Sequence, residues 1–140
     1  MDLQYGRLID RVRLEVRNLE RSKLFYKAVL RELARDLSHE DENSFTADEL
    51  LVTESGDTPS RVHLVLRAVD RETVERFHAV GLAAGGVDNG APGERNHQRG
   101  HYAAYLLDPD GNSIEVACYG APQRERREPL AERALQPPVA

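Results

Sequence analysis

The chain has 140 residues, of which 24 are acidic and 19 are basic, so its formal net charge is -5. This length allows one domain or two small modules that share a core, and the negative balance argues against a nucleic-acid binder that works through bulk positive charge. Cys118 is the single cysteine, which excludes an intramolecular disulfide and a thiolate zinc cluster. The sequence shows neither an apolar run of membrane-spanning length nor a secretory start, so we expect no membrane partner and a cytoplasmic location.

The first predicted unit is a strand followed by a helix. Val12, Leu14 and Val16 alternate with charged residues, which predicts a half-buried strand. Asn18 is suited to cap the helix that follows, and apolar residues recur along one stripe of residues 25–33. The change from a period of two to helical spacing marks the boundary between the two elements.

The second predicted unit repeats this order with an offset of 52 residues. Leu14 falls on Leu66 and Phe25 falls on Phe77 at this offset, which is 66 minus 14. Residues 62–68 again alternate like a strand, and Asp70 is suited to cap the second helix. Further strands are predicted after the helices, over residues 45–54, 101–108 and 112–119.

Two segments are predicted to be irregular. Residues 81–100 contain six glycines, but a phosphate-binding loop would precede a helix, whereas this segment follows one. We therefore expect a helix cap and a long mobile loop. Residues 121–140 are rich in charge and proline and predict an arm, with a short helix over residues 130–135. A solvated arm and an arm that crosses to a second subunit are the two alternatives.

The sequence Asp-Pro-Asp-Gly at residues 108–111 predicts a hairpin closed by a left-handed glycine. In this hairpin opposing residue numbers sum to about 220. Tyr105 then lies opposite Glu115, and His101 lies opposite Tyr119. The apolar residues on the other face are expected to pack against the helices, and they are Tyr102, Ala104, Leu106, Ile114, Val116 and Cys118.

Charged residues collect on the strand faces that point away from the predicted helices. The alternation places His63 and Glu115 on such a face, and Arg11 is the repeat equivalent of His63. Arg13 and Arg67 lie near them in the same pattern. If the face is enclosed, a buried carboxylate needs a cation, hydrogen-bond donors or water. If the face is open, the same side chains are simply solvated, and the residues alone leave both interpretations open.

Two stretches, DRVRLEVRNLERSKLFYKAVL and HYAAYLLDPDGNSIEVACYG, resemble the vicinal oxygen chelate superfamily. This superfamily includes glyoxalase I, extradiol ring-cleavage dioxygenases, fosfomycin-resistance enzymes and bleomycin-resistance proteins. The resemblance covers roughly residues 8–120. It implies an α+β fold of two tandem βαβββ modules, over residues 1–56 and 57–120, whose mixed sheets curl around a cavity. It also implies a homodimer, with residues 121–140 as an arm outside the modules.

The same resemblance implies a set of metal ligands. Carried over by position, His63 and Glu115 would hold a divalent ion, with Fe(II) or Mn(II) favoured and Zn or Ni as further options. Arg11 stands where the first module usually supplies a ligand, and an arginine cannot coordinate a metal. Two protein ligands are one fewer than a catalytic metal site usually has, so the alternative of no metal stays open.

Catalytic residues are implied in the same way. Tyr105 lies ten residues before Glu115 with a Pro-x-Gly turn between them, which is the spacing seen in extradiol dioxygenases. His97 or His101 is placed similarly to the histidine that handles protons in those enzymes. The implied roles are substrate hydrogen bonding for the tyrosine and proton transfer for one of the two histidines.

Two functions follow from the resemblance. The first is a metal-dependent enzyme, dioxygenase-like or lyase-like, that acts on a small oxygenated substrate and takes a third ligand from elsewhere, such as a partner chain. The second is a metal-free binding or resistance protein in which Arg11 pairs with Glu115, or clamps an anionic ligand together with Arg13 and Arg67. A dimer with a merely packed cavity is a third option. We favour the enzyme, because Tyr105 and His63 have no other evident use.

Overall fold

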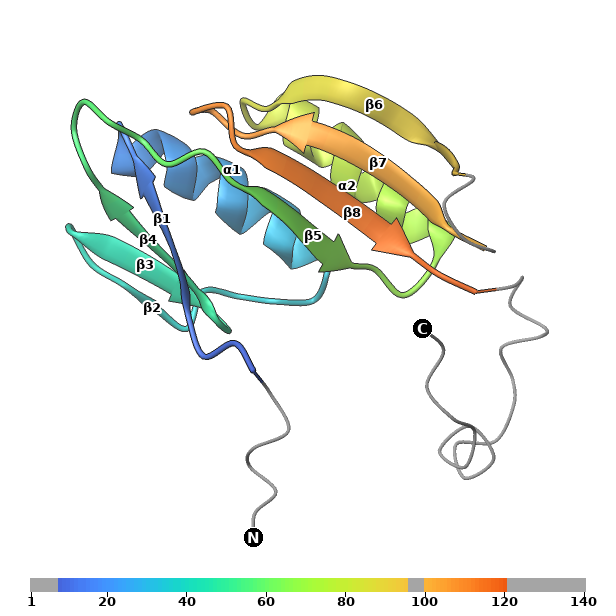
Figure 1. The fold of residues 1–140 in the computed structure, drawn as a ribbon, viewed down its shortest axis with the longest axis horizontal. Helices are drawn as coiled ribbons and strands as arrows, with labels where there is room; N and C mark the ends of the chain where they lie inside the picture. The colour runs from blue at the N-terminus through green and yellow to red at the C-terminus, as the bar shows by residue number, and fades with distance from the viewer. Residues whose placement is uncertain (1–7, 96–99, 121–140) are drawn as a thin grey trace, which may run out of the picture.

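The computed structural model describes residues 8–95 and 100–120, and its elements occur twice in the order βαβββ (Figure 1). The first module contains β1 (Val12–Val16), α1 (Leu19–Glu32), β2 (His39–Glu40), β3 (Ser44–Ala47) and β4 (Leu50–Glu54). The second contains β5 (His63–Arg67), α2 (Arg71–Ala83), β6 (Val87–Glu94), β7 (Tyr102–Leu107) and β8 (Ser113–Cys118). The predicted α+β fold of two tandem modules is confirmed.

Each module forms a mixed sheet of four strands with the same topology. The strand orders are β1-β4-β3-β2 and β5-β8-β7-β6, and the first strand of each module runs parallel to the last. The two sheets remain separate (Figure 1). The described residues therefore do not complete the predicted curling of both sheets around one cavity.

Both helices begin where the sequence predicts. The side chain of Asn18 accepts a hydrogen bond from the backbone N–H of Arg21 at 3.0 Å, and that of Asp70 accepts from Thr73 at 2.9 Å. Such caps satisfy backbone donors that the first helical turn leaves unpaired. No helix in residues 8–95 and 100–120 is both long enough and apolar enough to cross a membrane.

The core lies between the sheets and the two helices, which pack against each other. Phe25 and Phe77, the pair related by the repeat, are both 0% exposed. The ring of Phe25 occupies space that a side chain at Gly86 would need, because a Cβ built there would lie 2.7 Å from it. Because Gly86, which follows α2, has no side chain, the ring of Phe25 on α1 can lie close to it.

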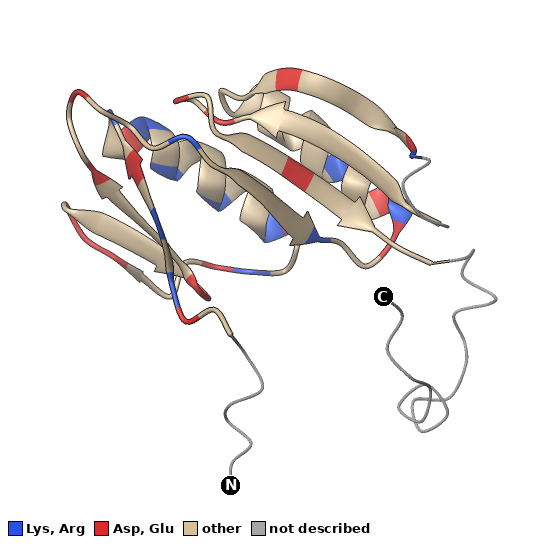
Figure 2. Cartoon of the chain, viewed as in Figure 1, with Lys and Arg blue, Asp and Glu red and all other residues tan. Residues whose placement is uncertain are grey.

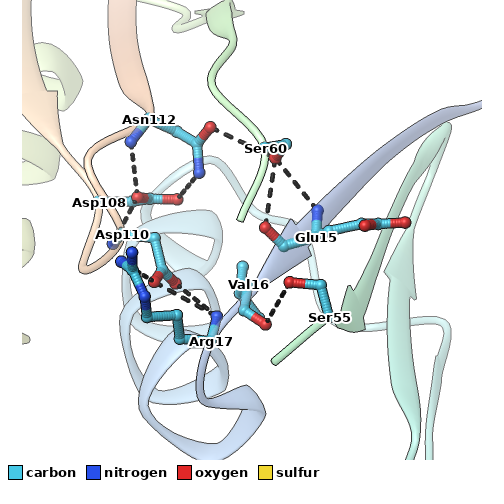
Figure 3. Close-up of polar contacts among 8 residues, drawn as sticks. All are labelled: Glu15, Val16, Arg17, Ser55, Ser60, Asp108, Asp110 and Asn112. Atoms are coloured by element: carbon cyan, nitrogen blue, oxygen red, sulfur yellow. Dashed lines mark hydrogen bonds and ion pairs between the residues drawn. The ribbon is translucent and has the colours of Figure 1, made fainter. Parts of the chain in front are cut away.

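A hydrogen-bonded junction joins the modules at the end of β1 (Figure 3). The backbone N–H of Ser60 donates to the carbonyl of Glu15 at 2.8 Å, and the hydroxyl of Ser60 accepts from the N–H of Glu15 at 3.1 Å. The carboxylate of Asp110 accepts from the N–H of Arg17 at 3.3 Å. These bonds tie β1 to the segment before β5 and to the β7–β8 turn.

The β7–β8 hairpin has the predicted turn and register. The N–H of Asp108 donates to the carbonyl of Asn112 at 2.9 Å, and Gly111 has the left-handed φ of 92° that this turn requires. Tyr105 pairs with Glu115 across the two strands. The predicted core face is confirmed by Cys118, which is 5% exposed.

The prediction of a long loop after the second helix was wrong for residues 87–94. These residues form β6, an edge strand that pairs with β7 and has register shifts on either side of Gly90. Gly90 has a φ of 151°, and a Cβ there would lie 2.8 Å from the ring of Tyr105. Glycine therefore allows this irregular strand to pass directly over an aromatic ring. His97 and the predicted arm over residues 121–140 lie outside the described residues.

Candidate functional site

Glu115 is at the centre of a polar cluster on the face of the second sheet that points away from α2. Its side chain is almost fully buried, with 7% of the residue exposed. One carboxylate oxygen is 3.0 Å from Nε2 of His101, and the other is 3.3 Å from Nε2 of His63. The structure thus supplies the donors that a buried carboxylate requires.

His63 reaches Glu115 because of the parallel pairing of β5 with β8. The register places His63 beside Ser113 and Val65 beside Glu115, so the imidazole reaches the carboxylate diagonally. Its Nδ1 is 2.9 Å from the hydroxyl of Ser113. A carboxylate only accepts hydrogen bonds, so in the neutral imidazole that makes this contact Nε2 carries the proton and Nδ1 has the lone pair. About half of the His63 side chain is exposed, which leaves it accessible to a small molecule.

Tyr105 lies on the same face, opposite Glu115 in the hairpin. Burial, followed by the negative charge of Glu115, raises the pKa of the Tyr105 phenol, and the positive charge of Arg95 offsets part of this rise. The guanidinium carbon of Arg95 lies 5.0 Å from the centre of the Tyr105 ring, and its Nη2 donates to the carbonyl of Ala103 at 2.9 Å. The Tyr105 hydroxyl therefore stays protonated at neutral pH and can donate a hydrogen bond, and Arg95 packs against its ring.

A stack of aromatic and cationic groups borders the cluster. The rings of His101 and Tyr119 are 5.0 Å apart and nearly parallel. The guanidinium of Arg67 lies over the ring of Tyr119, with the guanidinium carbon 5.8 Å from the ring centre. The stack connects Arg67 to Glu115 only indirectly, through the rings of Tyr119 and His101.

The predicted residues of the first module are not part of this cluster. Arg13 pairs with Glu15 of its own strand, with Nε and Oε2 at 3.6 Å, and Arg11 is exposed just before β1. Among the hydrogen bonds and ion pairs of residues 8–95 and 100–120, none joins either arginine to Glu115. Figure 2 shows basic positions along β1 and α1, whereas most of the second sheet is uncharged.

The cluster fits a divalent metal only in part. His63 and Glu115, the two implied ligands, are adjacent, and His101 is on the far side of the same carboxylate. Within the described part of the chain, however, no three His, Cys, Asp or Glu side chains form a group that could hold a metal ion. A three-ligand metal site is therefore not built from these residues alone.

Sequence reasoning did not single out Arg95, Tyr119 and Ser113. The hairpin register already placed Tyr119 opposite His101, so its contact was within reach of that argument. Arg95 could not be found in this way, because it follows a glycine-rich segment with no strand pattern. Ser113 became a candidate only once the pairing of β5 with β8 was known.

Comparison with known proteins places the fold in one family. No protein-family model and no curated protein matches the sequence. Among solved structures, a glyoxalase/bleomycin resistance protein from Albidiferax ferrireducens is 30% identical, with a TM-score of 0.70 over 79% of this chain and 98% of that chain.

More distant structures share the fold. A glyoxalase/bleomycin resistance protein/dioxygenase family enzyme from Burkholderia phytofirmans is 19% identical, with a TM-score of 0.63 over 80% of this chain and 98% of that chain. A lactoylglutathione lyase from Agrobacterium tumefaciens is 18% identical, with a TM-score of 0.60 over 79% of this chain and 92% of that chain. Together with the two-module fold, these similarities show that the chain belongs to the glyoxalase/bleomycin resistance protein family of the vicinal oxygen chelate superfamily.

Proposed function

We propose that the chain is an enzyme that transfers a proton on a small oxygenated substrate, at the face of the second sheet that carries Glu115. The observation that carries this proposal is the buried carboxylate of Glu115, whose two oxygens face imidazole nitrogens of His63 and His101 at 3.3 and 3.0 Å. A carboxylate in this position fixes the tautomer of an imidazole and stabilises the imidazolium that forms when it takes a proton.

Each group has a distinct part in the proposed reaction. Tyr105 donates a hydrogen bond to the carbonyl oxygen of the substrate. His63 removes a proton from the adjacent carbon through Nδ1, once Ser113 has turned its hydroxyl away. The C–H electron pair forms the C=C bond of an enolate while the carbonyl π electrons move onto the oxygen, and return of the proton to the same carbon restores the substrate. In an α-hydroxy carbonyl compound the α-hydroxyl proton can move to the enolate oxygen, and protonation of the former carbonyl carbon then gives the isomeric carbonyl compound.

The test is exchange of hydrogen for deuterium at the α-carbon of hydroxyacetone and lactaldehyde in deuterated buffer, followed by NMR. We expect Glu115→Gln and His63→Ala to slow the protein-dependent exchange about 100-fold, which is the usual scale of general base catalysis. His39→Ala is the matched control, because His39 is exposed and pairs only with the nearby Asp41 in the described structure. Exchange that is absent with both substrates, or unchanged in His63→Ala, would contradict the proposal.

A divalent metal enzyme is the second candidate, because His63 and Glu115 lie together as that function needs. The third ligand would come from a second copy of the chain in a homodimer, which would also bring Arg11 and Arg13 of that copy to the site. A bound ion would act as a Lewis acid toward substrate oxygens. Our first proposal predicts that protein purified without chelators, and then reconstituted with Fe(II) or Mn(II), holds well under one ion per chain by elemental analysis. A full ion per chain that His63→Ala removes would favour the metal enzyme instead.

A further inference from the structure

A cavity of about 300 Å³ lies between the two modules, away from the Glu115 cluster. β1 and the segment before β5 are hydrogen-bonded at Glu15 and Ser60, and the cavity opens toward the other end of the two strands. Helix α1 lies beside both strands (Figure 1), and Leu30 of α1 and Leu33 just after it are part of the cavity lining. The larger apolar residues that line the cavity are Val12, Leu30, Leu33, Leu50, Leu64 and Leu66.

The leucines of the cavity and the Glu115 cluster lie on opposite faces of β5, and Arg67, at the end of the strand, lines the cavity and also contacts Tyr119. Leu64 and Leu66 point toward the helices and pack against the core, whereas His63 points to the other face and contacts Glu115. Side chains alternate between the two faces of a strand. A molecule in the cavity would therefore contact the leucines of β5 and leave the Glu115 cluster accessible.

Within residues 8–95 and 100–120, Arg67 is the one cation of the cavity lining that has no ion pair with a carboxylate. Arg35 and Asp48 both line the cavity and pair with each other, with Nε and Oδ2 at 3.0 Å. Arg67 also lines it, and its guanidinium lies over the ring of Tyr119. Among the ion pairs of residues 8–95 and 100–120, none involves Arg67. Glu49 is the remaining charged residue of the lining, and it lies on the turn between β3 and β4.

We propose that this inter-module cavity binds a small apolar carboxylate, with its hydrocarbon part among the leucines and its carboxylate on Arg67. The volume is at the lower end of the range for small-molecule sites, about 300–1,000 Å³. Since a water molecule takes up about 30 Å³, the cavity holds on the order of ten groups of that size. The guanidinium fork matches a carboxylate in shape and charge, so the mouth selects an anionic end over a neutral one.

The experiment is titration of octanoate into the full chain by calorimetry, with octanol as the neutral comparison. We expect one octanoate per chain, weaker binding of octanol, and a loss of about tenfold in octanoate affinity in Arg67→Gln, since a charge-assisted hydrogen bond contributes about that factor. Arg61→Gln is the matched control, because Arg61 is exposed and is not part of the cavity lining. Leu33→Trp, which fills the cavity from the residue that follows α1, should abolish binding while the helical circular dichroism stays unchanged.

Each alternative occupant gives a different result. If a second copy of the chain covers the cavity, octanoate does not bind and Leu33→Trp shifts the mass in analytical ultracentrifugation, which would overturn the proposal. Equal octanoate affinity in Arg67→Gln and the unchanged chain would also overturn it. Glu115→Gln should keep full octanoate binding, so failure of the proposed proton transfer and failure of this site can be told apart.

Discussion

Replacing Asp108 with alanine is expected to lower the free energy of unfolding by about 3–5 kcal/mol. Asp108 is 1% exposed, and its carboxylate accepts hydrogen bonds from the N–H groups of Asp110 and Asn112, from the Asn112 amide and from the Tyr26 hydroxyl. Burial, and then the charge of Asp108, raises the pKa of Tyr26, so its hydroxyl stays protonated and donates. Alanine would leave these buried donors without their acceptor, at about 1–3 kcal/mol each before relaxation.

Urea unfolding followed by circular dichroism measures this loss. Asp36→Asn is the matched control, since Asp36 is exposed and surface changes of this kind usually stay within about 0.5 kcal/mol. A loss below about 1 kcal/mol in Asp108→Ala would show that the turn and Tyr26 find other partners. The expected loss would instead identify this carboxylate as the main polar link between α1 and the β7–β8 hairpin.

Phe25→Ala should reduce the free energy of unfolding by about 3–5 kcal/mol, the usual cost of emptying the space of a buried aromatic ring. Phe25 is 0% exposed and packs edge-on against Tyr26, with ring centres 4.9 Å apart. It also fills the space beside Gly81 and Gly86. Loss of the ring would therefore leave a void between the two helices. The close-packed backbone around it can shift only slightly, so the void would not be filled.

Two substitutions serve as controls for this measurement, Leu24→Ala at an exposed position and Phe77→Ala at an equally buried one. Leu24 is 69% exposed on the same helix, so its truncation should cost less than about 0.5 kcal/mol. Phe77 is the repeat equivalent of Phe25 and equally buried, so its truncation should cost about as much. If Phe25→Ala were no worse than Leu24→Ala, the contact between the helices would not stabilise the fold as we argue.

The elements that could be predicted are those set by local pattern. The offset that relates Phe25 to Phe77 identified two equivalent buried positions, and Asn18 and Asp70 marked both helix starts. The turn at residues 108–111 fixed the register of a whole hairpin, because side chains alternate strictly along a strand. For the helix caps and the turn, neighbouring residues carried all the information that the prediction needed.

What could not be predicted depends on irregular or distant contacts. β6 contains residue types that are unusual in strands, among them Gly90, Pro92 and Gly93. It is held by its pairing with β7 and not by its own sequence pattern. The separation of Arg11 from Glu115 could not be predicted from local pattern either. The repeat makes Arg11 the equivalent of His63, but it does not say how the two sheets are placed relative to each other. The adjacency of His63 and Glu115 was predictable in outline, since both belong to one sheet.

The edges of the two sheets differ in how readily they could accept another strand. The outer edges are β2, which has only two residues, and β6, which has register shifts and a proline. Short, bulged and proline-containing edges discourage the pairing that leads to fibrils. The inner edges, β1 and β5, are regular strands of five residues each. Regular hydrogen-bonding edges are therefore found in β1 and β5, at the inner side of each sheet, whereas the outer edges resist the addition of a further strand.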